Sequence, residues 1–237
     1  MKVFVTLPTY NERDNIAALI EEIRSVQSGI YIVVADNDSP DGTWKIVENI
    51  ARNDSGIFLL RRTENKGRGS AGIDAFRFAL DHGADVVIEM DADFSHYPKY
   101  IPVFLEEIRQ YDLVLGSRFV DGGRDLRNSF IRNGLSTLSA LYARTVLGLP
   151  VKDCNSGYRC FRRDVLTGVD VASLRSTGPS IVQELLYKAY LKGFSIKEIP
   201  IDFSERKAGV SNLNFKRLLR GFLMVLEMKS LHMAGKL

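Results

Sequence analysis

The stretch Val86–Pro98 reads VVIEMDADFSHYP, and its pattern indicates where this chain places a functional site. It opens with a mostly apolar run, which is typical of a strand buried on both faces of a sheet. Asp91 and Asp93 follow at once, one residue apart. A buried strand that ends in two carboxylates predicts an acidic site at the edge of a sheet.

The segments around this stretch alternate between strand-like and helix-like patterns. Apolar runs, often β-branched, predict strands at 2–8, 30–35, 56–62, 85–90 and 112–118. Apolar residues at helical spacing predict helices between them, at 12–27, 43–53 and 69–83. Such alternation is typical of right-handed βαβ units, so we expect an α/β fold with a mostly parallel sheet flanked by helices.

The acidic residues fall where such a sheet binds ligands. Asp36, Asn37 and Asp38 follow the second predicted strand, and Asp91 and Asp93 follow the fourth. In open α/β sheets, ligands bind beyond the carboxyl ends of the strands. We therefore expect both acidic sets at one edge.

The second half of the chain is less regular. Helices are predicted at 129–148 and 179–193, and a strand at 194–203. From Leu213 onward, apolar residues recur at helical spacing beside Lys and Arg, which predicts an amphipathic helix. We interpret residues 1–212 as one domain and 213–237 as a C-terminal helix.

Composition narrows the class of protein. The 237 residues suffice for one sizeable core. No run of about eighteen apolar residues predicts a transmembrane helix, and the N-terminus lacks a signal-peptide layout. Cys154 and Cys160 are too few for a disulfide framework, so we expect free structural thiols in a reducing compartment.

The net charge of +3 conceals an uneven distribution. Residues 1–117 carry 12 Lys and Arg against 19 Asp and Glu, a balance of −7. Residues 118–237 carry 20 against 10, a balance of +10. This indicates an acidic site in the first half and a surface that faces anions or a membrane in the second, with an uneven solvated surface as the alternative.

Asp91 and Asp93 are spaced to converge on one divalent cation once the backbone leaves strand geometry. Mg²⁺ and Mn²⁺ prefer such oxygen ligands and often bind substrate phosphate as well, so a nucleotide diphosphate bridged by metal fits the pattern. Taken alone, the pair is more typical of a solvated loop. A lone histidine in a loop, such as His96, more often forms a structural hydrogen bond than a bond to a metal.

Several motifs recur in an order that resembles a known family. They are PTYNERDN (8–15), DSPDGT (38–43), MDADFSHYPKYIP (90–102), GSRFVDGG (116–123) and DCNSGYRCFRR (153–163). Together they resemble the family 2 inverting glycosyltransferases of GT-A fold, and within it the dolichol-phosphate (polyprenyl-phosphate) mannose synthases, over almost the whole chain. A Rossmann dehydrogenase is excluded, because no G-x-G-x-x-G follows the first strand.

The resemblance implies a Rossmann-like GT-A domain with a nucleotide-sugar half, 1–117, and an acceptor half, 118–212. Nucleotide-sugar contacts are implied or expected at Pro8, Tyr10, Glu12, Asp36, Asn37, Asp38, Lys66, Asp91, Ala92 and Arg206. Lys66 and the nearby Arg68 either face the nucleotide or are charged residues exposed to solvent. The metal, Mg²⁺ or Mn²⁺, is expected at Asp91, Asp93 and Ser95.

Three positions depart from the pattern of the family or of some of its members: Asn37, Asn212 and Ser95, where some relatives have Gln. Asn37 stands where an Asp is usual, and an amide donates as well as accepts, which leaves the choice between guanine and uracil open. In the basic loop RKAGVSN, Asn212 replaces a Lys, for which Lys207 or Lys216 would compensate.

On the acceptor side, the resemblance implies phosphate contacts at Arg118, Arg132 and Ser136. Asp93, Arg118 and Arg132 are the expected catalytic residues. Asp153 and Arg159 either shape the floor of the acceptor site or pair with each other. Gln183 and Glu184 either face the acceptor or are ordinary helix residues.

The resemblance implies inverting transfer of mannose from GDP-mannose to dolichyl or another polyprenyl phosphate. A phosphate monoester has a second pKa of about 6, so near pH 7 it needs no strong general base. Direct displacement at the anomeric carbon would give a β-linked product. Metal and arginines would supply the positive charge that the phosphates need.

From Arg206 onward the chain carries seven Lys and Arg and one acid, Glu227. This pattern suits an interfacial helix on an anionic membrane or, as the alternative, a helix packed on the domain. Some family members continue into transmembrane helices, whereas this sequence ends. We therefore expect peripheral contact with the cytoplasmic face of a membrane, directly or through a partner subunit, and no nucleic-acid partner.

Three alternatives remain open on the residues alone. UDP-glucose or a UDP-N-acetylhexosamine would serve the same chemistry with a different base. A non-catalytic nucleotide-binding subunit of a membrane complex is suggested by Asn37, Ser95 and Asn212. A nucleotidyltransferase would release pyrophosphate instead of a nucleoside diphosphate.

Overall fold

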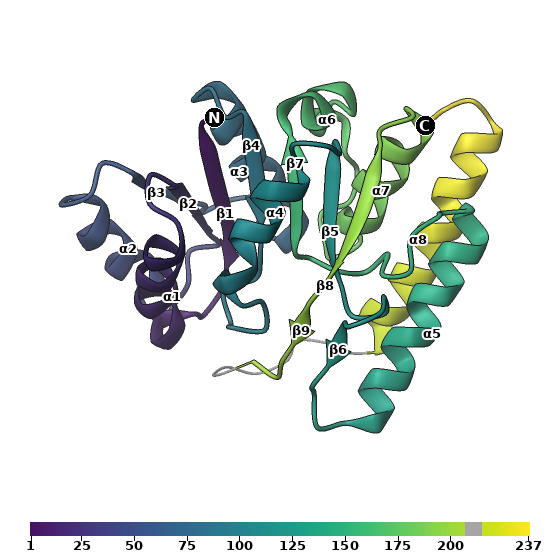
Figure 1. Cartoon of the computed structure of the whole chain (residues 1–237), viewed down its shortest axis with the longest axis horizontal. Coiled ribbons are helices and arrows are strands. Elements are labelled where there is room, and N and C mark those ends of the chain that lie inside the picture. Colours follow the sequence, from purple (N-terminus) through teal and green to yellow (C-terminus); the bar gives the residue numbers. More distant parts are fainter. Residues whose placement is uncertain (207–214) are drawn as a thin grey trace.

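The fold is organised around a mixed sheet, shown in the computed structural model of Figure 1. The structure describes residues 1–206 and 215–237, apart from the side chains of 215–219. The sheet contains β1 (Val3–Thr9), β2 (Tyr31–Asp36), β3 (Ile57–Arg61), β4 (Val86–Glu89), β5 (Leu113–Ser117), β7 (Arg159–Arg162) and β8 (Ile196–Pro200). A separate pair is formed by β6 (Arg124–Asp125) and β9 (Asp202–Phe203).

Helices connect these strands and cover both faces of the sheet. They are α1 (Arg13–Val26), α2 (Thr43–Ala51), α3 (Arg68–Asp81), α4 (Ile101–Glu107), α5 (Phe130–Leu147), α6 (Arg163–Gly168), α7 (Ile181–Leu191) and α8 (Phe215–Met233), with 3₁₀ turns η1 (Pro98–Tyr100) and η2 (Val171–Ser173). Alternate strand residues face opposite ways: Val5 packs with α1 and α4, and Phe4 with α3. The predicted α/β class is therefore confirmed.

The strand order is β3-β2-β1-β4-β7-β5-β8. Every neighbouring pair is parallel except those of β7, which runs antiparallel between β4 and β5. The sequence did not reveal β7, because Arg159 and Arg162 interrupt its apolar character. The single strand predicted at 194–203 was also wrong, because Ile201 separates β8 from β9 and the latter joins β6.

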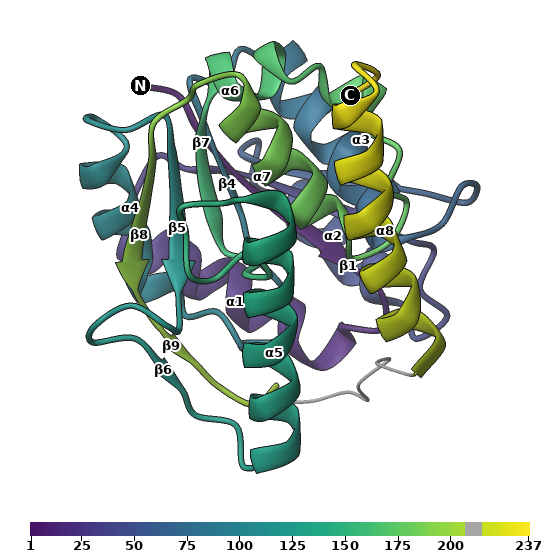
Figure 2. The same cartoon turned by 90° about the vertical axis from the view of Figure 1, so that its right-hand side faces the viewer.

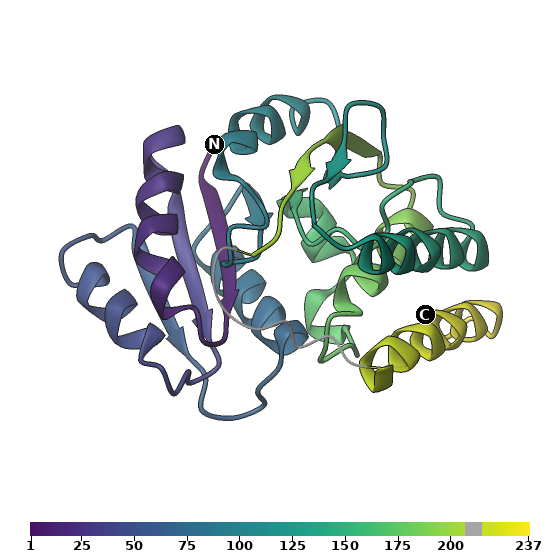
Figure 3. The same ribbon diagram turned by 90° about the horizontal axis from the view of Figure 1, so that it is seen from below.

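The parallel register brings the predicted acidic segments to one edge. Thr9 at the end of β1 pairs with Asp36 at the end of β2, and β4 pairs with the other side of β1. The carboxyl ends of these strands point to the lower edge in Figure 1, which faces the viewer in Figure 3. The segments that follow β1, β2 and β4 therefore share this edge.

The predicted C-terminal helix is α8, which packs beside α5 and α7 (Figure 2). The Tyr142 hydroxyl donates to Phe222 O at 3.1 Å, and Tyr187 Oη lies 2.6 Å from His232 Nδ1. Val225 and Met228 are buried. One face of α8 is thus part of the core. In the part of the chain that the structure describes, every helix is too short or too polar to cross a membrane.

Both cysteines are free and buried, as expected. Burial raises the pKa of Cys154 to about 12 and that of Cys160 well above its ordinary value. A thiol held in this state is protonated at neutral pH and has little nucleophilic character. The thiols are therefore structural.

Candidate functional site

Asp91 lies at the exit of β4 among charged groups. Arg68, the first residue of α3, donates to Asp91 Oδ1 at 3.1 Å and to Glu89 Oε1 at 2.9 Å. Although burial opposes ionisation, the Arg68 charge holds the pKa of Asp91 below its ordinary value. The Asp91 backbone N–H donates to His96 Nδ1 at 3.0 Å, and burial lowers the pKa of His96. His96 is thus a neutral structural residue, as its loop position suggested.

Asp93 is buried two residues further on. Its Oδ1 accepts from the Ser95 N–H at 3.0 Å and from the Ser95 hydroxyl at 2.6 Å, which fixes the carboxylate. Its Oδ2 lies 3.1 Å from Arg206 Nη2. Ala92, between the two aspartates, is buried. The predicted metal ligands Asp91, Asp93 and Ser95 therefore belong to one loop.

The end of β1 carries three predicted nucleotide contacts. Pro8 belongs to the strand, and Tyr10 beyond it is 49% exposed. Glu12 precedes α1 and accepts from Asn15 Nδ2 at 2.8 Å. Burial raises the pKa of Glu12 to about 7, and Asp93 contributes in the same direction. Glu12 therefore lies within electrostatic range of the aspartates of the β4 loop.

Asp36, the last residue of β2, and the two residues that follow it have different roles in this structure. Asp36 is buried and accepts from the Thr9 hydroxyl at 2.8 Å and from the Ser39 hydroxyl at 2.7 Å, so it holds the loop together. Asn37 Oδ1 accepts from Arg62 and from Gly67 N, while Asn37 Nδ2 donates to Thr9 O at 3.4 Å. An Asp could not make that last bond.

Asp38 is the polar residue of this trio that reaches solvent. It forms ion pairs with Arg61 at 2.7 Å and with Lys66 at 3.1 Å, which lower its pKa. The Arg61 guanidinium lies 3.6 Å from the ring centre of Trp44. These residues and Tyr10 line a cleft of about 850 Å³. Tyr10, Asp38 and Lys66 are thus brought together, as a nucleotide site requires.

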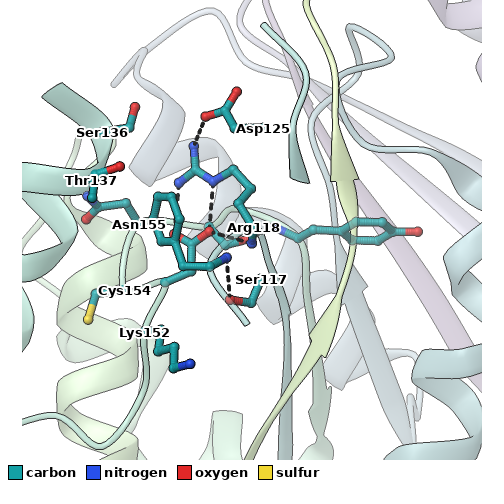
Figure 4. A network of polar contacts seen from close by, with 12 residues as sticks. Ser117, Arg118, Asp125, Ser136, Thr137, Lys152, Cys154 and Asn155 are labelled. Atoms are coloured by element: carbon teal, nitrogen blue, oxygen red, sulfur yellow. Dashed lines mark hydrogen bonds and ion pairs between the residues drawn. The ribbon is translucent and has the colours of Figure 1, made fainter. Parts of the chain in front are cut away.

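Arg118, a predicted catalytic residue, lies in a buried ionic network shown in Figure 4. Its Nε and Nη2 each donate to Asp153 at 2.8 Å, and its Nη1 lies 3.7 Å from Asp125. The Arg118 side chain is 7% exposed, and that of Asp153 is 0%. The suggested pairing of Asp153 with Arg159 was wrong, because Arg118 takes this carboxylate.

Arg159 is buried and donates instead to the backbone carbonyls of Cys154, Ser156 and Val182. Desolvation lowers its pKa to about 10. In the same motif, Gly157 lies against the loop that follows β4, since a Cβ at this position would be 3.0 Å from Arg68 Nη2 and 3.5 Å from Asp91 Oδ2. Part of DCNSGYR therefore borders Asp91.

Arg132 and Ser136 lie one turn apart on α5. Arg132 is half exposed and pairs with Glu205 at 3.1 Å. The Ser136 hydroxyl accepts at 2.7 Å from Arg127, which also pairs with Asp125. Arg127 was missed by the sequence analysis, since it lies outside every motif, although a basic residue shortly before this helix was a signal.

Consecutive residues connect the two halves of the site. Glu205 contacts Arg132 of α5, and Arg206 contacts Asp93 of the loop that follows β4. The basic loop that follows, with Lys207 and Asn212, lies outside the described residues, as does the side chain of Lys216. The expected compensation for Asn212 by Lys207 or Lys216 stays a prediction.

Gln183 and Glu184 are both buried at the start of α7. Gln183 Nε2 donates to Asn155 Oδ1 at 2.6 Å. Glu184 accepts from the backbone N–H groups of Arg175 and Ser176 at 2.8 to 3.1 Å. Glu184 is therefore an anchor for the loop before α7, not an ordinary surface residue of a helix.

Open α/β sheets bind their ligands beyond the carboxyl ends of the strands, and this chain places two aspartates there. Residues 4–169 match the family model described as glycosyl transferase family 2. The chain belongs to this family.

Relatives match over most of their length. An undecaprenyl-phosphate mannosyltransferase from Micrococcus luteus is 37% identical over 90% of this chain and 88% of its own. A polyprenol monophosphomannose synthase from Mycolicibacterium smegmatis is 34% identical over 95% of this chain and 86% of its own.

A solved structure confirms the architecture. Glucosyl-3-phosphoglycerate synthase from Mycobacterium tuberculosis, in complex with Mn²⁺, UDP-glucose and phosphoglyceric acid, superimposes with a TM-score of 0.66. The match covers 99% of this chain and 80% of that one at 21% identity. At this identity the likeness establishes the fold and leaves the substrates to be argued separately.

Proposed function

We propose that the protein transfers mannose from GDP-mannose to a polyprenyl phosphate such as dolichyl phosphate. The observation that carries the proposal is the near full-length match to undecaprenyl-phosphate and polyprenol mannosyltransferases. The geometry supports it, because an acidic loop suited to metal and diphosphate adjoins a side that carries Arg127 and Arg132.

The carboxylates of the β4 loop fit a divalent cation. The Asp91 side chain is 36% exposed, and Asp93 follows in the same loop. The described residues contain no cluster of three or more His, Cys, Asp or Glu that would enclose a metal alone. This donor set suits Mg²⁺ or Mn²⁺, which would take further oxygens from a diphosphate and water. We assign Asp91 and Asp93 as ligands, with Ser95 holding Asp93.

Transfer of a sugar to a lipid phosphate needs positive charge near the phosphates more than it needs a general base. A lipid monophosphate is largely dianionic near pH 7, so its oxygen attacks the anomeric carbon without a strong general base. A cation at Asp91 and Asp93 would stabilise the departing diphosphate. The chain has to hold two phosphates in line and reduce their repulsion, which is the role of its arginines.

We assign the acceptor phosphate to the N-terminal end of α5, where Arg132 lies. Arg132 is 46% exposed, and its present partner, Glu205, is exposed as well, so a phosphate would compete for its guanidinium. Ser136 lies on the same helix and orients Arg127. Arg118 is buried against Asp153 and contributes fixed positive charge behind this surface. On the donor side, Tyr10, Asp38 and Lys66 line the cleft for the nucleotide.

An exposed apolar strip supports contact with a membrane surface. Its residues lie on α5 and α8, with exposed fractions from 41% to 97%: Phe130, Ile131, Leu135, Leu138, Leu141, Leu223 and Leu226. Apolar side chains beside Arg and Lys favour an interfacial position on an anionic leaflet. We propose peripheral attachment to the cytoplasmic face, where a lipid phosphate would reach Arg132.

A donor panel tests the proposal. Purified protein is incubated with Mn²⁺ or Mg²⁺, a short polyprenyl phosphate, and GDP-mannose, UDP-glucose or UDP-N-acetylglucosamine, and lipid-linked sugar is counted. We expect product from GDP-mannose, loss of turnover with a chelator, and loss of turnover in Asp93→Ala. Product from a UDP-sugar alone would assign another donor, and release of pyrophosphate would indicate a nucleotidyltransferase.

The Asp93→Ala variant needs a matched control, because Asp93 also fixes Ser95. Ser95→Ala removes that hydroxyl but keeps the carboxylate and its bond from the backbone N–H of residue 95, so it should lose less turnover than Asp93→Ala. Absence of transfer from every donor by folded wild-type protein, together with nucleotide binding, would favour a non-catalytic subunit instead.

A further inference from the structure

A buried ion pair lies beside the proposed metal ligand Asp91. The Glu89 side chain is 3% exposed, and Arg68 contacts its Oε1 at 2.9 Å. A carboxylate buried this deeply requires a charged partner. The same guanidinium reaches Asp91 Oδ1 at 3.1 Å. Arg68 is therefore held from behind by Glu89 and presents its charge to Asp91.

The backbone of Arg68 is held in place as well. The next residue, Gly69, donates its N–H to Thr177 O at 2.9 Å. A Cβ on Gly69 would lie 2.3 Å from Ser176 O, so only glycine permits this approach. Glu184 holds the same loop through Ser176 N at 2.8 Å. The start of α3 is thus packed tightly against its neighbours.

We propose that Arg68 is a built-in counter-cation at Asp91, which makes binding of the divalent metal depend on the nucleotide diphosphate. The inference rests on the proposed function, since it assumes a metal at Asp91. Arg68 acts through Asp91: its Nη2 donates to Oδ1 at 3.1 Å, so this carboxylate already has a positive partner before any metal binds.

The charges around the loop give the reason. Arg68 at Asp91 and Arg206 at Asp93 each place a positive group where a cation would bind, and like charges at such short range oppose it. A diphosphate brings negative charge that offsets both guanidinium groups. Metal and diphosphate then strengthen each other's binding, and this coupling is reciprocal.

Mn²⁺ binding, followed by the electron paramagnetic resonance signal of the free ion, tests this without turnover. Wild-type protein is titrated alone, with GDP, and in parallel with UDP. For R68Q without nucleotide we expect Mn²⁺ to bind about tenfold tighter or better than to wild type, because a positive charge in contact with Asp91 is removed. For E89Q we expect weaker binding, because the charge of Arg68 is no longer offset.

Two further variants separate charge from folding. R68K keeps the charge and should stay close to wild type. R68Q/E89Q removes both members of the Arg68–Glu89 ion pair and should still bind Mn²⁺ alone more tightly than wild type. Shifts of R68Q and E89Q in the same direction, or no gain in the double variant, would overturn the role of Arg68. Absence of Mn²⁺ binding by wild type even with a nucleotide would overturn the metal site itself, and this inference with it.

Discussion

Arg118 and Arg132 are both expected to contact phosphate, yet their surroundings differ. Arg118 is 7% exposed and makes a two-pronged contact with Asp153, which solvent does not reach. Arg132 and its partner Glu205 are 46% and 45% exposed. The energetic worth of an ion pair depends on this difference, because water screens an exposed pair and a buried one loses its compensation when one member is removed.

We predict opposite outcomes for the two alanine variants. Arg118→Ala strands the buried Asp153 carboxylate and should lower the free energy of unfolding by about 3–5 kcal/mol. Arg132→Ala should change it by about 1 kcal/mol or less, while raising the KM for the polyprenyl phosphate. Urea unfolding and acceptor kinetics measure both quantities. Equal stability losses would contradict the distinction, and an unchanged acceptor KM in Arg132→Ala would remove that residue from the acceptor site.

Helices α5 and α8 pack side by side, and they carry both buried and exposed apolar residues. Val225 and Met228 of α8 enter the core, whereas Ile131 and Leu138 of α5 are 77% and 61% exposed. One face of α8 packs on the domain, as one of the two alternatives for this helix expected. Membrane contact, the other alternative, stays a prediction that rests on the exposed apolar residues of α8 and α5. The sequence pattern predicted amphipathic helices but not which apolar residues would meet the core.

We predict that Ile131→Ser with Leu138→Ser lowers binding to anionic vesicles severalfold and leaves the melting temperature nearly unchanged. The reason is that exposed apolar groups contribute to membrane burial and little to folding. Met228→Ala is the matched control, which should cost about 2–5 kcal/mol of stability and spare vesicle binding. Undiminished sedimentation of the serine variant with vesicles would show that this strip is not the membrane contact.

The elements that the sequence predicted were those with a regular hydrophobic period. The first four strands and three helices were recovered within a few residues, and so was their common edge. Strand β7 was missed because it contains a buried charged residue, Arg159. Hydrogen bonds to backbone carbonyls permit this burial, and a hydrophobic pattern gives no sign of them. Glu89 was missed for a similar reason: an acid inside VVIEM was a signal of a buried charge, but its partner Arg68 lies 21 residues earlier.

The charge balance and the motifs change near residue 117, but the folded structure does not divide there. The −7 half and the +10 half meet inside one sheet, because β7 from the second half lies between β4 and β5 of the first. Each of these strands needs β7 for its hydrogen bonds on one side. The boundary that we expected near residue 117 is therefore not the boundary of a folding unit.

We predict that a fragment of residues 1–117 does not fold alone, and that the full chain unfolds in a single transition. Without β7, the buried strand β4 would expose an unpaired edge, and β5 would lose its neighbour. Circular dichroism and amide hydrogen exchange on the fragment measure this. A protected, cooperatively melting fragment would contradict the prediction and restore the first half as an independent domain.

The position of β7 also sets an order of events during synthesis. By the time Arg162 leaves the ribosome, β4 and β5 have been exposed for dozens of codons, and at about 5–20 residues per second that interval lasts several seconds. During this time the nascent chain presents two apolar strands whose shared partner does not yet exist. A chaperone that shields strand edges would act in this window, and slow codons between Ser117 and Arg159 would lengthen it and lower the yield of soluble protein.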